Sequence, residues 1–281
     1  MRILSIQSHV AYGYAGNSAA VFPLQRLGHE VYPVLTVTFS NHTGYPTVRG
    51  PVVAPDDVRA VIDGIEERGV FPHIDAVLSG YQGAETVGAV VLDAVARVKA
   101  ANPAAVYCCD PVMGDVHRGM FVREGIPDYM RDDVVPAADI VTPNQFELEY
   151  LTGRSVTTLA DVVMAAGQLQ RMGPATVLVT SVLTEETPPD SIQMLCAATE
   201  GTWLVTTPLL PLTVQGGGDV TAAVFLAHTL ADGPQVALSR TAATMYAVLA
   251  ATHEADRREL AIIGAQDAIA HPDNRFEAIA L

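Results

Sequence analysis

The stretch TVQGGGDVTAAVFLAH, residues 213–228, places three glycines and an aspartate directly before a run of small and apolar residues that predicts a helix. The consecutive N–H groups of Gly216, Gly217 and Gly218 can face an anion at the positive end of that helix. Asp219 is electrostatically costly beside an anion unless its carboxylate acts there, for example by taking a proton from an attacking hydroxyl group. The alternative is a flexible turn in which Asp219 only caps the helix.

Two further stretches carry carboxylates at positions that could do chemistry. DPVMGD holds Asp110 and Asp115 around a proline and a glycine, either as two turn-forming residues or as a carboxylate pair for Mg²⁺, which prefers oxygen ligands. TPNQFELEYLTG predicts a helix that starts at Pro143 or Asn144, with Glu147 in its first turn. A capping role explains Asn144 and Glu147 adequately, and a role in ligand binding stays open.

A single lysine, Lys99, limits the possible mechanisms. It lies in ARVKAANP with no glycine loop before it, so the chain has no Walker A loop, no strand lysine of a protein kinase and no Schiff-base lysine in a pocket. If the protein binds a polyphosphate, helix N-termini, backbone N–H groups, a few arginines and a metal ion must meet the charge.

Composition narrows the class of protein further. The chain has 281 residues, 49% of them hydrophobic, and a formal net charge of −15. This negative charge argues against a protein that binds nucleic acid or anionic membranes. The N-terminus is too polar for a signal peptide, and no apolar stretch is long enough to span a bilayer, so we expect a cytoplasmic protein. Cys108, Cys109 and Cys196 have no metal-ligand spacing and are expected to be reduced core residues.

Segments that predict strands alternate with segments that predict helices, which is typical of βα units stacked into a largely parallel sheet with helices on both faces. Strands are predicted at residues 2–8, 29–40, 75–80, 105–111, 139–144 and 176–181, followed by two antiparallel strands, SIQMLCAAT and TWLVTTP. Helices are predicted at residues 16–28, 55–68 and 84–101, after Leu159, and in three stretches near the C-terminus. No linker, charge block or repeat divides the chain, so we expect one α/β domain over residues 1–281.

Ligands of such sheets bind beyond the carboxyl ends of the strands, in the loops that lead into helices. These loops are mostly polar or rich in glycine, and they carry Ser8, SNHTGY (40–45), SGYQG (79–83), DPVMGD (110–115), TPNQFE (142–147) and Thr180–Ser181. The clustering of such residues at one predicted edge favours a ligand site there.

The same loops, in this order, resemble those of the pyridoxal kinases of the ribokinase-like superfamily. The resemblance runs from residue 3 to about residue 230 and rests on IQSHVAYGYAGNSAAVFPLQRLG, FSNHTGY, LSGY, CDPVMGD, DIVTPNQFELEYLTG, VLVTS and GGGDVTAA. It implies a three-layer α/β/α sandwich with a central, mostly parallel sheet and a homodimeric protein. The implied reaction is transfer of the γ-phosphoryl group of ATP to the 5′-hydroxymethyl group of pyridoxal, pyridoxine or pyridoxamine.

The resemblance also implies roles for individual residues. Asp219 corresponds to the catalytic base, and Gly216, Gly217 and Gly218 correspond to the anion hole. The implied contacts with the pyridine substrate come from Ser8, Thr43, Gly44 and Tyr81. The implied positions for nucleotide and metal are Asp110, Asp115, Thr142, Asn144, Glu147, Thr180 and Ser181, with Thr207, Pro208, Leu209 and Leu210 on the adenine side. Asp110 and Glu147 are the implied ligands of Mg²⁺. Whether a monovalent cation such as K⁺ is also required stays open.

The chain departs from the family pattern at Gly217, where relatives often carry a larger residue, and at Phe121, where some carry a tyrosine that reaches the nucleotide. Three other functions stay open at this point: a ribokinase-like kinase for a hydroxymethylpyrimidine or a sugar, a vitamin B6 carrier without catalysis, and an oxidoreductase. An intact Asp219 argues against the carrier. The spacing of Gly13 and Gly16 does not fit the dinucleotide-binding pattern that an oxidoreductase needs.

Overall fold

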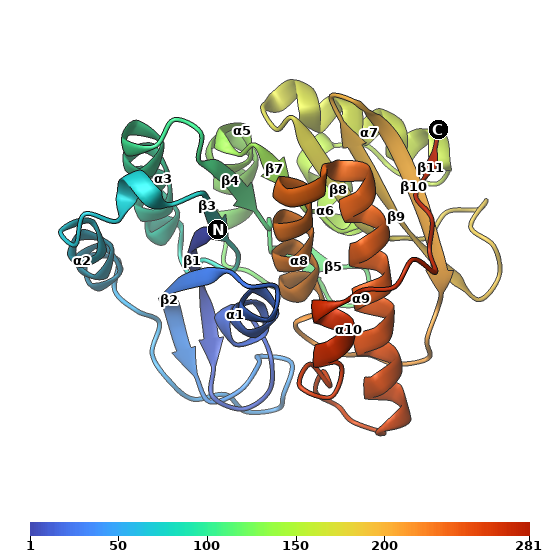
Figure 1. Cartoon of the computed structure of the whole chain (residues 1–281), viewed down its shortest axis with the longest axis horizontal. Helices are drawn as coiled ribbons and strands as arrows, with labels where there is room; N and C mark the ends of the chain where they lie inside the picture. Colours follow the sequence, from blue (N-terminus) through green and yellow to red (C-terminus); the bar gives the residue numbers. More distant parts are fainter.

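The computed structural model describes all residues, 1–281, and is built around one nine-stranded sheet (Figure 1). The strand order is β11-β10-β9-β8-β7-β4-β3-β1-β2, parallel from β2 to β8, with β9, β10 and β11 each antiparallel to its neighbour. The strands of this sheet are β1 (Arg2–Val10), β2 (Glu30–Phe39), β3 (Ala76–Ser79), β4 (Val106–Cys109), β7 (Ile140–Val141), β8 (Thr176–Val182), β9 (Ser191–Ala198), β10 (Gly201–Pro208) and β11 (Ile279–Ala280).

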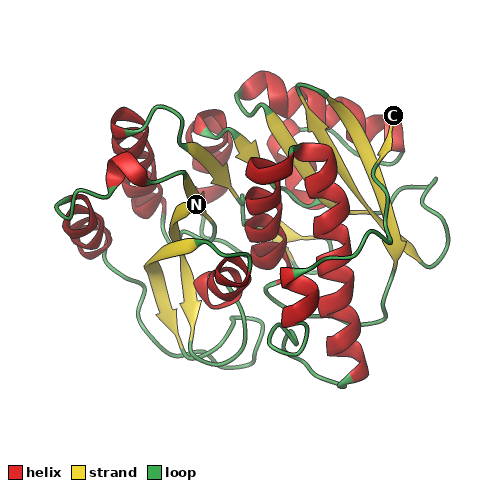
Figure 2. Ribbon diagram, viewed as in Figure 1, coloured by secondary structure: helices red, strands yellow, loops and turns green.

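Helices cover both faces of the sheet and give three layers (Figure 2). One face carries α1 (Asn17–Arg26), α8 (Gly217–Asp232) and α9 (Pro234–Glu254), and α10 (Gln266–Ala270) packs against α1 and α9. The other face carries α2 (Pro55–Glu66), η1 (Phe71–His73), α3 (Glu85–Ala101), α4 (Ile126–Tyr129), η2 (Met130–Val134), α5 (Val135–Ala137), α6 (Gln145–Thr152) and α7 (Leu159–Met172).

Alternating side chains of the strands supply the two cores. Leu4 and Cys109 point into the core shared with α2 to α7, whereas their neighbours Ile3 and Cys108 point into the core shared with α1, α8 and α9. Because successive strand residues face opposite sides, a strand buried on both faces is apolar throughout, which is the pattern that parallel sheets require. All three cysteines are buried and free, so the prediction of reduced core residues is confirmed.

The predicted α/β/α sandwich, with its mostly parallel sheet and two antiparallel strands, is confirmed. The sequence did not predict the short hairpin of β5 (Gly114–Asp115) and β6 (Gly119–Met120), the edge strand β11, or the broken helix formed by α4, η2 and α5. None of the helices combines the length and the apolar character that a membrane crossing requires.

Candidate active site

The mouth of α8 is shaped by Gly216. This residue is the N-cap, with a left-handed backbone at φ 81°, and a Cβ atom there would lie 2.1 Å from the carbonyl oxygen of Tyr14. Only glycine fits both conditions. The helix begins at Gly217, so Asp219 is its third residue, and the interpretation of Asp219 as an N-cap is wrong. The N–H groups of Gly217 and Gly218 lie in the first turn, where the helix offers no acceptor.

The carboxylate of Asp219 is half-buried at this mouth. Burial raises its pKa to about 6, although the N–H groups of Gly16 and of Asp219 itself favour the charged form. Gly16 has φ 55°, and a Cβ atom there would lie 2.3 Å from Oγ of Ser8. Ser8 near the end of β1, Gly16 before α1 and Asp219 in α8 therefore meet at one point.

Asp110 lies on the other side of the mouth, after β4. A Cβ atom on Gly218 would lie 3.7 Å from Oδ2 of Asp110, and Oδ1 accepts a hydrogen bond of 3.0 Å from the hydroxyl group of Thr142. Asp110 is only 4% exposed, and its Oδ2 has no hydrogen-bond partner. Burial, with the nearby charges of Glu147 and Asp219, raises the pKa of Asp110 well above its usual range. A buried, unpartnered carboxylate oxygen is suited to a cation.

Glu147 joins this acidic cluster and also caps α6. Its side chain and that of Asn144 form a capping box, and Oε1 accepts hydrogen bonds from the N–H groups of Met113 (2.8 Å) and Gly114 (3.4 Å). Burial raises the pKa of Glu147 to about 7 against these hydrogen bonds. The capping interpretation is confirmed. Because no three acidic, histidine or cysteine side chains group as metal ligands, a metal ion here would need oxygens from phosphate and water.

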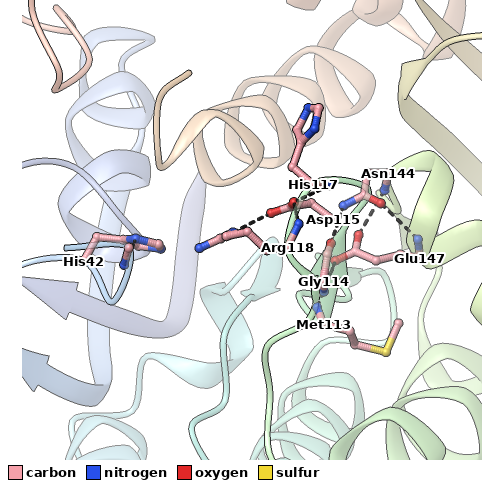
Figure 3. A network of polar contacts seen from close by, with 9 residues as sticks. His42, Met113, Gly114, Asp115, His117, Arg118, Asn144 and Glu147 are labelled. Carbon is pink, nitrogen blue, oxygen red and sulfur yellow. Dashed lines mark hydrogen bonds and ion pairs between the residues drawn. The ribbon is translucent and has the colours of Figure 1, made fainter. Parts of the chain in front are cut away.

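Beside this cluster, the β5–β6 hairpin carries the positively charged side chain of Arg118 (Figure 3). Oδ1 of Asp115 accepts hydrogen bonds from the N–H groups of His117 (3.0 Å) and Arg118 (2.8 Å), and Oδ2 pairs with Nε of Arg118 at 2.7 Å. The turn-forming interpretation of Asp115 is therefore confirmed. The guanidinium group of Arg118 stacks on the ring of Phe121, with 4.3 Å to the ring centroid.

His42 lies across from this hairpin in the loop that follows β2 (Figure 3). Burial, together with the charge of Arg118, lowers its pKa to about 4, and its Nδ1 accepts a hydrogen bond of 2.9 Å from the N–H group of Gly44. A Cβ atom on Gly44 would lie 3.5 Å from the side-chain amide of Gln215, which directly precedes Gly216. The loop that carries Thr43 and Gly44 therefore meets the mouth of α8.

The remaining predicted residues lie at the same edge of the sheet. Tyr81 follows β3, and burial raises the pKa of its half-buried phenol. Thr180 and Ser181 lie at the end of β8, where Ser181 has an unusual φ of 53°. Because β8 and β10 are both antiparallel to β9, they end at the same edge, which places Thr207, Pro208, Leu209 and Leu210 there as well.

Four polar side chains around the site were not predicted. His42 lies within the stretch 40–45 and Arg118 lies three residues after the stretch 110–115, but nothing in their spacing indicated a role. Arg258 and Glu259 follow α9, and no local pattern connects them with residues 11–16 or 41–45, which they contact.

Comparison with known proteins gives a consistent result. The model of the family described as phosphomethylpyrimidine kinase matches residues 24–260. Pyridoxal kinase PdxY of Leifsonia xyli is 57% identical over 277 residues and that of Corynebacterium diphtheriae is 56% identical over 278 residues, each alignment covering 98% or more of both chains. The solved structure of the pyridoxal kinase from Leishmania donovani in complex with ADP and pyridoxamine has a TM-score of 0.92 and 31% identity, and covers 100% of this chain and 99% of that one. The chain therefore belongs to the phosphomethylpyrimidine kinase family and, within it, to the pyridoxal kinases.

Proposed function

We propose that the mouth of α8 is the place where this pyridoxal kinase transfers the γ-phosphoryl group of ATP to the 5′-hydroxymethyl group of a B6 vitamer. The observation that carries this proposal is the half-buried carboxylate of Asp219, with a pKa raised to about 6, beside the open N–H groups of Gly217 and Gly218. Such a carboxylate is ionised at neutral pH and is still basic enough to accept a proton.

In this mechanism, Asp219 accepts the proton of the hydroxymethyl group while the oxygen atom forms a bond to the γ-phosphorus atom. The bond from that phosphorus to the β-phosphate oxygen breaks, and ADP leaves. The N–H groups of Gly216, Gly217 and Gly218 face the equatorial oxygens of the transferring group, where a fixed donor stabilises developing charge without reorganisation. Ser8, Thr43, Gly44 and Tyr81 hold the pyridine ring so that its hydroxymethyl group faces Asp219.

Asp110 and Glu147 are the proposed ligands of Mg²⁺, since Oδ2 of Asp110 is buried without a partner and both carboxylates have raised pKa values that a cation would lower. Mg²⁺ bound there would offset the negative charge of the phosphates. With 16 basic residues against 31 acidic ones, the chain itself has little charge to do so. We expect turnover to cease in excess chelator and to return with Mg²⁺. Full turnover in chelator would contradict the assignment.

The nucleotide lies, in this proposal, along the ends of β7, β8 and β10. The residues that would contact it are Asp115, Thr142, Asn144, Thr180, Ser181, Thr207, Pro208, Leu209 and Leu210. A monovalent cation such as K⁺ has no residue assigned to it in this proposal. ATP as co-substrate and three reduced cysteines fit a cytoplasmic enzyme.

A second acceptor class follows from the family description, which names a phosphomethylpyrimidine. The test is an ATP-consumption assay with pyridoxal, pyridoxine, pyridoxamine and hydroxymethylpyrimidine side by side. We expect the three vitamers to be phosphorylated with a kcat/KM at least about tenfold above that for the pyrimidine, a difference of about 1.4 kcal/mol in the barrier. Faster turnover of the pyrimidine would overturn the proposed acceptor.

A further inference from the structure

The carboxylate of Glu259 is buried, with the residue only 7% exposed, and it joins two loops that are distant in sequence. Its Oε1 accepts a hydrogen bond of 2.5 Å from the hydroxyl group of Tyr45, and its Oε2 accepts one of 3.1 Å from the N–H group of Tyr14. Tyr14 lies in the loop between β1 and α1, and Tyr45 follows Thr43 and Gly44 in the loop after β2. One side chain therefore connects both loops that flank the proposed acceptor position.

The first loop is shaped around this carboxylate. Gly13 has φ 84°, and a Cβ atom there would lie 2.0 Å from Oε2 of Glu259. On its other side, the same loop places the carbonyl oxygen of Tyr14 where a Cβ atom on Gly216 would clash. Residues 13–14 are therefore held between Glu259 and the mouth of α8.

The second loop is held in the same way by two neighbouring side chains. The guanidinium group of Arg258 stacks on the ring of Tyr45, 3.9 Å from its centroid, and its Nη2 donates a hydrogen bond of 3.3 Å to the carbonyl oxygen of Gly44. Gly44 in turn lies against the side chain of Gln215. Arg258 and Glu259 thus fix this loop from outside, while the segment before α8 limits it from inside.

The segment that carries this pair is itself fixed to α8. Leu260 and Ile262 are fully buried in a core cluster that includes Val220 and Val224 of α8. The N–H group of Ala261 also donates a hydrogen bond of 2.8 Å to the hydroxyl group of a buried threonine in α9. Any shift of Glu259 relative to the helix that carries the proposed base would have to disrupt this packing.

We propose that Glu259 is a positioning residue: it keeps the loops at residues 8–16 and 41–45 in fixed positions relative to Asp219. The inference rests on the proposed function, because it takes residues 8–16 and 41–45 to line the acceptor position. Glu259 does not touch the reacting atoms. It acts through Tyr14 and Tyr45, and small displacements of a bound substrate strongly reduce the rate of a transfer reaction.

The test compares KM for pyridoxal with KM for ATP in two variants. In E259M the side chain keeps its length but has no carboxylate oxygens, so both Tyr14 and Tyr45 lose their acceptor. Y45F removes the same hydrogen bond from the loop side and leaves the core segment intact. We expect each variant to raise KM for pyridoxal by about tenfold, with KM for ATP changed less than about twofold, and the double variant to add little.

Asp75→Ala is the matched control. Asp75 also joins distant segments, by accepting a hydrogen bond of 2.7 Å from the N–H group of Arg2, but it lies at the opposite edge of the sheet. D75A removes this acceptor and should lower the melting temperature without changing either KM. Unchanged KM for pyridoxal in E259M and Y45F, or equal rises for both substrates, would overturn the positioning role. A wild-type enzyme that does not phosphorylate pyridoxal would instead contradict the proposed function.

Discussion

At the scale of single residues, the environment of Asp219 separates a catalytic role from a structural one. A capping aspartate accepts hydrogen bonds that lower its pKa, as Asp161 does at the start of α7, where the pKa falls to about 2. Asp161 and Asp219 are each the third residue of their helix, but the pKa of Asp219 is raised by burial to about 6 instead of being lowered. The folded protein therefore holds this carboxylate at a cost to its charged form, which is typical of functional groups rather than of caps.

Asp219→Asn keeps the shape of the side chain and removes its basicity. General-base assistance contributes about 10²- to 10⁴-fold to a rate, so we expect kcat to fall by that factor with KM for ATP little changed. Because the folded-state pKa lies above the ordinary value, loss of the charge at neutral pH should leave the melting temperature unchanged or raised. Steady-state kinetics and thermal melting check both expectations, and an unchanged kcat would defeat the assignment.

The pH dependence of kcat/KM follows from the same carboxylate. The base must be ionised, so kcat/KM should be constant above the pKa of about 6 and fall tenfold for each pH unit below it. The acid limb should be absent from the residual activity of D219N, measured under identical conditions. If the limb persists in that variant, another group governs it.

At the scale of elements, local pattern predicted most of the fold, but not the parts that depend on contacts between distant residues. The alternation of buried strands and amphipathic helices was visible in the sequence because each element carries its own periodicity. The β5–β6 hairpin was missed for another reason: each of its strands has only two residues, which is too few to show a periodicity.

The site shows the same division. Polar loops at strand ends could be recognised one by one, and the structure brings Ser8, Asp110, Thr142 and Asp219 together as expected. The start of α8 could not be placed from the sequence, because aspartate is common at helix N-caps and Asp219 was therefore a candidate. The structure places the N-cap at Gly216, which has a left-handed backbone. The contacts of Glu259 span 214 and 245 residues, and no local pattern reports such a pairing.

Two neighbouring glycines allow a test of how the mouth of α8 is built. Gly216→Ala introduces a side chain at φ 81° and within 2.1 Å of the carbonyl oxygen of Tyr14, so we expect the free energy of unfolding to fall by about 1–3 kcal/mol. Gly217→Ala is the control, since the nearest atom to its Cβ would be Cε of Met245 at 3.9 Å, and its stability should stay within about 1 kcal/mol of wild type. Denaturant unfolding of both variants decides. Equal losses would mean that backbone conformation does not explain the glycine at position 216.

At the scale of the whole molecule, the sheet gathers loops from across the chain at one edge. Strands β1, β3, β4, β7, β8 and β10 all end there, because the parallel strands share one direction and β9 restores it for β10. The segment after α9 then returns to the same edge to contact the loops near the N-terminus. The loops around the proposed acceptor position are therefore held by contacts between the N-terminal part of the chain and the segment after α9. For this reason we propose that residues 1–281 form one domain.

The number of chains in the assembled protein is also a property of the whole molecule. We propose a homodimer, as the family resemblance implies, and each chain brings a formal net charge of −15. Two such chains repel one another over a Debye length of about 30 Å at 0.01 M salt but only about 8 Å at 0.15 M. Sedimentation at micromolar concentration in 0.15 M salt should therefore give twice the 29.7 kDa of one chain, and the dimer should weaken as salt is removed. If only a 29.7 kDa species is found in 0.15 M salt, the dimer is contradicted. If the two chains associate more strongly at the lower salt, attraction between opposite charges, not apolar contact, holds the dimer together.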